Sequence, residues 1–363
     1  MTEETRPDPP AGMRRIDHEY SRSLAAFLAQ HRVSLLITTY EAGRLVLAAP
    51  SADGRELDLS YRGLTSPMGV AIRTDADTLA VAVQDQVWQF RNVPGLAARL
   101  DPPGTHDACY LPRQAVYTGP IDAHEMAWCG GDLWIVNTLF SCLCTLDGVH
   151  NFVPRWKPRF ITAIAAEDRC HLNGLGLIGG QPAYVTALGE TDTKEGWRPG
   201  KASGGCVIDV KSGQPVVRGL SMPHSPRPRD GGVLLLESGR GRIVRADPGS
   251  GTVESIAEVP GYGRGLAFVG GYAFVGLSRF RKSSSTPTFG NLPISERTTP
   301  LTCGVSVVDL AGGREVARLE FHTGIDEIFD VQVLPYRHPW FSGPHPKTDE
   351  IPPIWVVPQP REL

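Results

Sequence analysis

Four segments of the chain begin with a polar side chain that can bind a ligand or carry a proton. Each continues with an apolar stretch, a tight turn and a second apolar stretch, and the four align on the turn without a gap. They read HEMAWCGGDLWIVNT, NGLGLIGGQPAYVTA, HSPRPRDGGVLLLES and RGLAFVGGYAFVGLS, and they begin at His124, Asn173, His224 and Arg264. Because two imidazoles, an amide and a guanidinium occupy one repeat position, we expect them to share a site.

Two looser copies extend the repeat. MGVAIRTDADTLAVAV begins at Met68, and EIFDVQVLP begins at Glu327, with an alignment defined only to within two residues. Successive copies start 40 to 63 residues apart, which is typical of a four-stranded propeller blade with insertions. The six copies therefore predict an all-β, six-bladed β-propeller, with a β-sandwich as the alternative.

The ends of the repeat predict how the ring closes. The last copy lacks outer strands, whereas the chain begins with three strand-like stretches, SLLITTY, RLVLAA and ELDLSYR. Pairing these N-terminal strands with the C-terminal inner strand would complete the sixth blade and leave no open sheet edge. Residues 19–32 have the periodicity of one short amphipathic helix before the first strand.

Three parts of the chain are expected from this pattern. Residues 1–18 form a polar, disordered leader, residues 19–340 form the single propeller domain, and the proline-rich residues 341–363 form a tail packed on the surface. The seven cysteines are scattered through strand-like stretches, which favours buried free thiols.

In a propeller the first residues of the inner strands face one another at the mouth of the central channel. Arg264, Asn173 and the two histidines would meet there, and Met68 and Glu327 from the looser copies would complete the ring. The carboxylate of the ring would therefore come from Glu327. Further polar groups at the same level would come from three neighbours, Glu125, His171 and Ser225.

Three interpretations of this ring remain open. His124, His224 and Glu327 are a possible metal site for Zn, Mn or Fe. Alternatively, a histidine works as acid or base without a metal, with Glu327 as a second base and Arg264 holding an anion. In the third interpretation these side chains only fill the channel with mutual hydrogen bonds.

Two long loops, residues 188–205 and 277–302, should lie beside the ring, because each follows a second strand that returns to the mouth. They are rich in positive charge, which predicts a small anionic ligand. The loop residues expected to bind it, together with one from the SGRGR turn, are Trp197, Arg198, Lys201, Arg240, Arg279, Arg281 and Lys282.

Composition excludes some partners. The formal net charge is −3 and the pI is about 6.4, so no global basic field favours nucleic acid or an anionic membrane. The sequence shows neither a long apolar span nor a signal-peptide core, and we expect a cytoplasmic protein.

Phrases around the predicted mouth resemble a family of uncharacterised bacterial conserved hypothetical proteins. They include CHLNGLGL, YVTALGETD, GWRPGKASGG, GLSMPHSPR, PGYGRGLAF and EIFDV, and the resemblance runs from about residue 34 to residue 340. It implies a shared site at the mouth and no established activity. The ring is also similar in architecture to six-bladed metal-dependent lactonases and lyases, but those lactonases use carboxylates and amides where this chain has two histidines and an arginine.

These observations predict an enzyme of the lyase, hydrolase or isomerase type. Its substrate would be a small anionic metabolite or a modified amino acid, bound at the channel mouth. The alternative is a non-catalytic propeller that presents one face to a peptide or protein partner.

Overall fold

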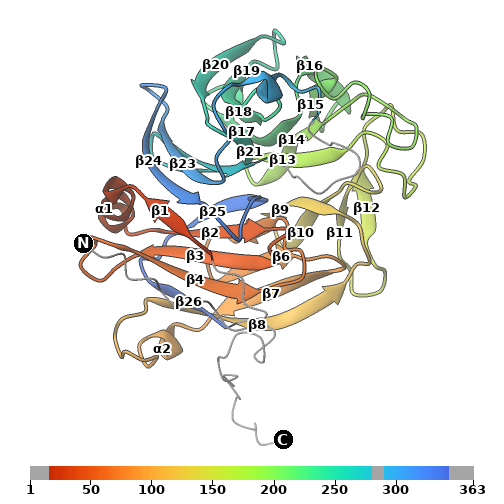
Figure 1. The fold of residues 1–363 in the computed structure, drawn as a ribbon. Helices are drawn as coiled ribbons and strands as arrows, with labels where there is room; N and C mark the ends of the chain where they lie inside the picture. Colours follow the sequence, from red (N-terminus) through yellow and green to blue (C-terminus); the bar gives the residue numbers. More distant parts are fainter. Residues whose placement is uncertain (1–15, 280–289, 343–363) are drawn as a thin grey trace, which may run out of the picture.

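The computed structural model describes residues 16–279 and 290–342 of the chain. Within these ranges the strands form six sheets, arranged around a common centre as the blades of a propeller (Figure 1). The predicted all-β, six-bladed fold is therefore confirmed. The innermost strands of the blades are β5, β9, β13, β17, β21 and β25.

The first two blades follow one another along the chain, and each is built from consecutive antiparallel strands. One blade contains β5 (Val70–Ile72), β6 (Thr78–Ala82), β7 (Gln86–Asn92) and β8 (Ala108–Tyr117), and its outer edge is extended in parallel by β26 (Pro339–Phe341). The next contains β9 (Ala123–Cys129), β10 (Asp132–Asn137), β11 (Cys142–Thr145) and β12 (Val153–Trp156).

The third and fourth blades have the same antiparallel order and carry two of the aligned segments. The strands of the third are β13 (Leu172–Ile178), β14 (Gln181–Ala187), β15 (Gly205–Asp209) and β16 (Gln214–Leu220). Those of the fourth are β17 (Pro223–Arg229), β18 (Gly232–Glu237), β19 (Arg242–Ala246) and β20 (Val253–Glu258).

The last two blades use both ends of the chain. One contains β21 (Tyr262–Val269), β22 (Tyr272–Ser278), β23 (Gly304–Asp309) and β24 (Arg314–Phe321), extended at its outer edge by β1 (His18–Tyr20). The other contains β25 (Asp330–Leu334) followed by β2 (Ser34–Thr39), β3 (Arg44–Pro50) and β4 (Leu57–Gly63).

The ring closes by antiparallel pairing of β25 with β2, in a register that places Thr38 opposite Asp330 and Ser34 opposite Leu334. This is the predicted closure between N-terminal strands and the C-terminal inner strand. The pairing joins C-terminal and N-terminal strands within one sheet and supplies the inner strand β25 with its three outer strands, β2, β3 and β4.

Short helices lie outside the sheets of the blades. The predicted N-terminal helix is α1 (Arg22–His31), and its residues Leu24 and Leu28 are fully buried in a core cluster. A short α2 (Pro94–Ala97) and a 3-10 helix η1 (Pro293–Glu296) lie in connections between strands. No helix in the described ranges is long and apolar enough to span a bilayer.

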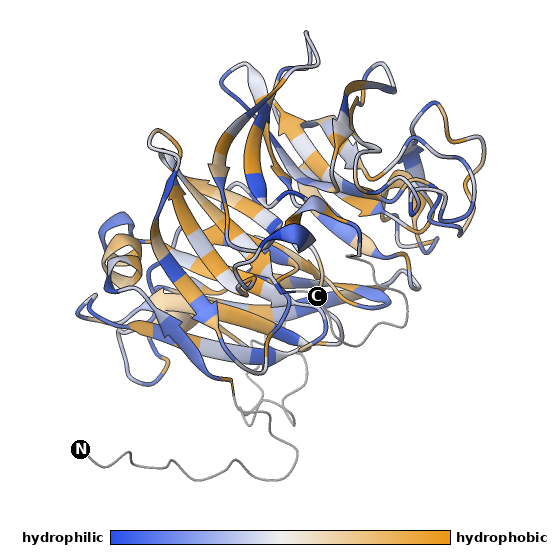
Figure 2. Ribbon diagram, turned by 45° about the horizontal axis from the view of Figure 1, so that its top comes forward, coloured by the Kyte–Doolittle hydropathy of each residue, from blue (hydrophilic) through white to orange (hydrophobic). Residues whose placement is uncertain are grey.

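The core lies between neighbouring blades. Apolar residues are concentrated along the strands, whereas hydrophilic residues predominate in many of the turns (Figure 2). All seven cysteines are buried and free, as the sequence predicts. Burial of this apolar surface is the main force that holds the blades against one another.

Side-chain hydroxyls add a second connection between blades. Thr138 Oγ1 and Ser238 Oγ each donate a 2.6 Å hydrogen bond to a backbone carbonyl on the inner strand region of the following blade, that of Leu172 and of Gly263 respectively. Thr38 and Ser278 make the same kind of bond, to Met68 and Ile328. These four bonds hold the inner strands at fixed positions around the channel.

Candidate active site

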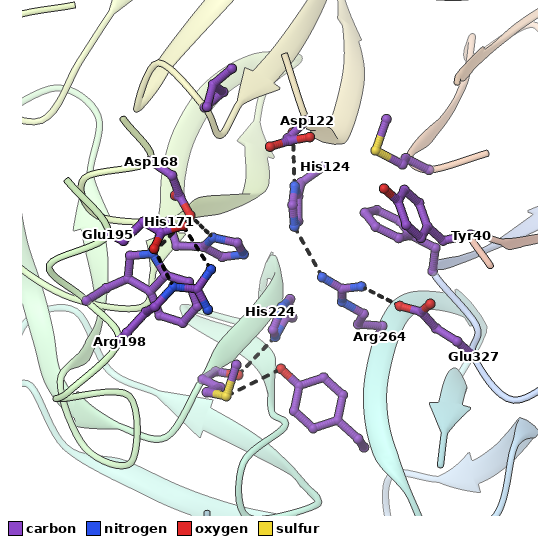
Figure 3. Close-up of a pocket in the computed structure, with 16 residues that line it drawn as sticks. Tyr40, Asp122, His124, Asp168, His171, Glu195, Arg198, His224, Arg264 and Glu327 are labelled. Carbon is purple, nitrogen blue, oxygen red and sulfur yellow. Dashed lines mark hydrogen bonds and ion pairs between the residues drawn. The ribbon is translucent and has the colours of Figure 1, made fainter. Parts of the chain in front are cut away.

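A cavity of about 350 Å³ opens at one end of the central channel. Five of the six residues that begin the aligned segments line it, and they come from five different blades (Figure 3). These residues are Met68, His124, His224, Arg264 and Glu327. The tertiary structure thus brings together side chains that are up to 259 residues apart in the sequence, between Met68 and Glu327.

A repeated backbone feature sets the start of four inner strands. The residues two positions before Met68, His124, Asn173 and His224 are all in the left-handed region, with φ of 47°, 50°, 50° and 48° for Ser66, Asp122, His171 and Met222. This conformation is unfavourable for residues other than glycine. Its recurrence shows that the sharp entry into the strand is part of the repeat.

His124 is held as one tautomer by its neighbours. Its Nδ1 lies 3.0 Å from the carbonyl oxygen of Asp122 and 2.8 Å from Thr138 Oγ1. A carbonyl oxygen only accepts hydrogen bonds, so Nδ1 carries the proton and Nε2 has a free lone pair. That lone pair accepts a 3.1 Å hydrogen bond from Nη2 of Arg264.

His224 is held in the same way one hundred residues further along. Its Nδ1 lies 2.9 Å from the carbonyl oxygen of Met222 and 3.0 Å from Ser238 Oγ. Here too the proton must be on Nδ1. The Nε2 atom is buried and has no hydrogen-bond partner among the described residues.

Both histidines are held in the neutral form. Burial is the main cause that lowers the pKa of His124 and of His224 well below the usual value of 6.5, and the positive charge of Arg264 lowers both further. Each imidazole therefore keeps an unprotonated Nε2 at neutral pH. An unprotonated nitrogen can accept a proton or a hydrogen bond from a ligand.

Arg264 connects the two sides of the cavity. Its Nη1 donates to Glu327 Oε1 at 3.0 Å while its Nη2 donates to His124, and its guanidinium carbon lies 4.4 Å from the ring centroid of Phe329. Glu327 is only 4% exposed. The guanidinium is thus fixed by a carboxylate and an imidazole (Figure 3) and by the aromatic face of Phe329.

A third histidine faces the first across the cavity. His171 Nδ1 lies 2.8 Å from Asp168 Oδ2, which also accepts a 3.0 Å hydrogen bond from Trp197 Nε1. The rings of His171 and His124 are nearly perpendicular, with centroids 4.9 Å apart. Asp168 therefore fixes the positions of both the His171 ring and the Trp197 indole at the cavity.

The loop of residues 188–205 covers this side of the cavity and supplies Glu195, Trp197 and Arg198 to its lining. Arg198 forms an ion pair with Glu195 at 3.0 Å, and its guanidinium carbon lies 4.7 Å from the ring centroid of Trp197. Trp197 itself packs in a buried cluster with Leu292 and Ile294 of the other long loop. The two loops therefore support each other above the ring.

The other expected site residues lie in different places. Asn173, Glu125 and Ser225 line a smaller cavity that shares His124, His224 and Arg264 with the main one. Three expected anion-binding residues are absent from the described lining of the main cavity, namely Lys201, Arg240 and Arg279. Arg240 pairs with Glu237 and Arg279 with Asp326. Arg281 and Lys282 lie outside the described residues.

The arrangement fits a metal centre poorly. In the described ranges no group of three or more histidine, cysteine, aspartate or glutamate side chains is placed to hold a metal ion. The reason is visible in the geometry, because the Arg264 guanidinium lies between His124 and Glu327 and bonds to both (Figure 3). A cationic group in this position opposes binding of Zn, Mn or Fe.

Several residues of the lining stand outside the positions that the repeat predicts for the site. They are Tyr40, Asp122, Leu139, Asp168, Glu195, Met222, Tyr262 and Phe329. One signal in the sequence is the hydroxyl residue that ends the second strand of an aligned segment. Thr138 and Ser238 occupy this position, and each is the hydrogen-bond partner of the histidine that begins the same segment. The left-handed residues two positions before each histidine have no such signature in residue type.

Comparison with known proteins identifies the family. A family model described as a domain of unknown function (DUF4915) matches residues 22–341. The chain belongs to this family. The match spans the predicted range of the resemblance, and the six blades of this DUF4915 domain lie almost entirely within it. No curated protein matches the sequence.

Solved structures similar to this DUF4915 domain share its fold at low sequence identity. One is a chain in a crystal structure of a nidogen/laminin complex, with a TM-score of 0.53, 10% identity, and coverage of 84% of this chain and 99% of the other. Another is a protein of unknown function from Bacteroides caccae, with a TM-score of 0.51, 10% identity and the same two coverages. At this identity the likeness shows the propeller fold alone.

Proposed function

We propose that the protein is an enzyme that acts on a small metabolite in the channel-mouth cavity by histidine acid–base chemistry. The observation that carries this proposal is the state of His224. Its Nε2 is unprotonated, buried and without a partner among the described residues. A buried acceptor left unpaired is costly in a folded protein, and such groups are found where function requires them.

Burial makes His224 the proposed base. It keeps the imidazole neutral, so that Nε2 can accept a proton. Once protonated, the same imidazole can return the proton to a leaving group. His171 lines the same cavity, where its Nδ1 lies 2.8 Å from the Asp168 carboxylate that fixes the orientation of its ring.

Charges in the lining favour a ligand that carries both signs. Arg198 and Arg264 are the cationic groups, and each is already paired with a carboxylate, Glu195 and Glu327. Asp122 and Asp168 add two more carboxylates. Of the predicted ligand classes, a modified amino acid with an anionic group and a nitrogen donor fits this balance better than a polyanion.

Aromatic and thioether side chains line the rest of the cavity. Tyr40, Tyr262, Met222 and Phe329 give it an apolar wall opposite the polar groups. A volume of about 350 Å³ is at the small end of ligand pockets. This supports a compact metabolite over a peptide as the ligand of this cavity.

A ligand-retention experiment tests the proposal. The purified protein is denatured and the released small molecules are identified by mass spectrometry, for the unchanged chain and for Arg198→Gln and His224→Gln. We expect a carboxylate- or phosphate-bearing compound whose retention falls at least about tenfold in each variant, because Arg198→Gln loses a charge-assisted hydrogen bond and His224→Gln loses a buried acceptor. Arg318→Gln, at an exposed position on β24, is the control and should retain the compound.

Equal retention by all four proteins would contradict the proposal. If nothing is released, thermal unfolding is measured with millimolar amino-acid derivatives, carboxylates and sugar phosphates. A rise in the unfolding temperature that disappears in His224→Gln supports the proposal. The absence of any rise across the panel would contradict it.

A protein-binding role is the second candidate, favoured by the opposite end of the channel. A hollow of about 380 Å³ lies there, lined by Trp128, Phe268 and Arg229 among others, residue types that are enriched in protein interfaces. The nidogen chain of similar fold was solved in complex with laminin. Loss of a specific partner in Trp128→Ala, with ligand retention unchanged, would support this role.

A further inference from the structure

A second, much smaller cavity lies directly beneath the channel-mouth cavity. Its volume is about 20 Å³, and it shares His124, His224, Arg264 and Phe329 with the main cavity. One buried water molecule requires roughly 10–15 Å³ of such space and two to four polar partners. The small cavity therefore has room for a single water molecule.

Three polar atoms of residues that line this cavity have no hydrogen-bond partner among the described residues. They are the Nε2 atom of His224, the side-chain amide nitrogen of Asn173 and the Nε atom of Arg264. All three are buried, and His224 and Asn173 are only 4% and 3% exposed. Buried polar groups without protein partners are ordinarily satisfied by ordered water.

The hydrogen-bonding role of each atom is set by its other contacts. Thr186 Oγ1 donates a 2.6 Å bond to the amide oxygen of Asn173, so the nitrogen remains as a donor. Both terminal nitrogens of Arg264 are used by Glu327 and His124, so its Nε–H remains as a donor. His224 Nε2 is the acceptor, because the proton is on Nδ1.

One acceptor and two donors on the protein match the hydrogen-bonding capacity of a water molecule, which can donate two hydrogen bonds and accept two. We infer that the small cavity binds one water molecule, which accepts from Asn173 and Arg264 and donates to His224 Nε2, and that this water is the nucleophile of the enzyme. The inference rests on the proposed function and narrows it, because a bound nucleophilic water selects hydrolysis among the lyase, hydrolase and isomerase reactions. The substrate would be an ester, lactone or amide with its carbonyl group above this water.

The bound water would attack the carbonyl group of the substrate. The water oxygen forms a bond to the carbonyl carbon while one of its O–H bonds breaks and the proton passes to His224 Nε2. The bond from that carbon to the leaving alcohol or amine then breaks, and the leaving group takes the proton from the imidazolium. The products are a carboxylic acid and an alcohol or amine, and His224 returns to its neutral form.

A crystal structure at a resolution that shows ordered water tests the binding site. We expect one water within hydrogen-bond distance of His224 Nε2, Asn173 and Arg264 Nε. In Asn173→Leu, which has nearly the same shape without the donor, this water should be lost while the fold is kept. The control is Asn151→Leu, an exposed position. A dry cavity, or a water that does not contact His224, would overturn the inference.

Hydrolysis of p-nitrophenyl acetate tests the role of this water. We expect steady release of p-nitrophenolate without a burst, slower in D₂O, and a decrease of about 10²-fold or more in His224→Gln, as loss of a general base implies. Asn173→Leu should also be slower, whereas the exposed His150→Gln should match the unchanged protein.

Three other kinetic results would overturn the inference. A burst followed by an acylated histidine would show that His224 attacks directly and would overturn the water mechanism. Rates equal in the unchanged protein and His224→Gln, or no rate above buffer, would overturn it as well. Ligand retention is measured in a separate experiment. These kinetic results therefore test the water mechanism alone, and the retention experiment tests whether the cavity binds a metabolite.

Discussion

Thr138 and Leu172 lie on neighbouring blades and are joined by a 2.6 Å hydrogen bond from the Thr138 hydroxyl to the Leu172 carbonyl. The same hydroxyl oxygen lies 2.8 Å from Nδ1 of His124. One side chain therefore ties two blades together and holds a site histidine in its tautomer. Ser238 has both roles for Gly263 and His224.

Removal of this hydroxyl should destabilise the protein. Thr138→Val keeps the shape of the side chain but leaves the buried Leu172 carbonyl and one side of His124 unsatisfied, which costs about 1–3 kcal/mol in free energy of unfolding. Urea denaturation measures the change, with the exposed Ser203→Ala as a control that should differ by less than about 0.5 kcal/mol. A Thr138→Val variant as stable as the control would contradict this role.

The buried histidines should make the protein less stable in mild acid. The pKa of His224 is well below 6.5 in the folded state, so below pH 6.5 the unfolded chain binds a proton that the folded protein does not. The free energy of unfolding should therefore fall as pH decreases from 6.5 toward 5. His124 acts in the same direction.

Urea denaturation of His224→Gln across this range isolates one histidine. The variant should show a shallower decrease between pH 6.5 and pH 5, because one of the two buried imidazoles has been removed. Ser203→Ala, at an exposed position without a titrating side chain, should keep the decrease of the unchanged protein. Identical slopes for all three proteins would show that His224 is not held neutral by burial.

Asp330 should have the opposite pH dependence. Burial, with the charge of Glu125 nearby, raises its pKa from 3.8 to about 6, although Val70 donates a backbone hydrogen bond to it and Arg227 and Gln332 oppose the rise. The folded protein thus binds the proton more tightly than the unfolded chain, and the stability from this group is lost as pH rises from about 4 to 6.

Asp330→Asn removes that titration. Replacing one acceptor oxygen changes the free energy of unfolding by an amount that does not depend on pH. On top of this constant, the free energy of unfolding of the variant should rise relative to that of the unchanged protein as pH increases from 4 to 7. Thermal or urea unfolding at several pH values measures the difference between the two proteins. The exposed, non-titrating Ser203→Ala should show a constant difference, and a constant difference for Asp330→Asn would contradict the raised pKa.

An ion pair inside the channel should contribute strongly to stability. Glu125 is paired with Arg227 and also accepts a 2.7 Å hydrogen bond from the backbone nitrogen of Leu175 on the next blade. Glu125→Gln would leave the Arg227 charge unpaired and should cost about 2–4 kcal/mol, less than for a fully buried pair because the Arg227 side chain is 21% exposed.

A double-mutant cycle separates the pair from its surroundings. The combined Glu125→Gln and Arg227→Gln variant should lose less free energy of unfolding than the sum of the two single variants. The exposed pair of Arg229 and Asp230, where Asp230 is 68% exposed, should show a coupling below about 1 kcal/mol. Additive losses for Glu125 and Arg227 would show that their contact adds nothing.

The architecture of this protein can be predicted from repeats in its sequence. Apolar stretches repeated on either side of aligned turns predict six blades, because each repeat can bury its apolar surfaces only against its neighbours. The incomplete last copy predicts the pairing of β25 with β2. The same repeat predicts that residues such as His124 and His224 lie around one channel, since equivalent positions of a ring face a common axis.

The chemical states of these side chains depend on contacts that the folded chain makes between blades. The guanidinium of Arg264 reaches His124 and Glu327 from another blade, and this contact makes a metal centre unfavourable. Lys201, Arg240 and Arg279 carry the predicted charge, but the paths of their loops leave them off the cavity lining. Long side chains pair with whatever carboxylates the fold places nearby, and the neutrality of a histidine depends on burial, so neither is encoded in local sequence.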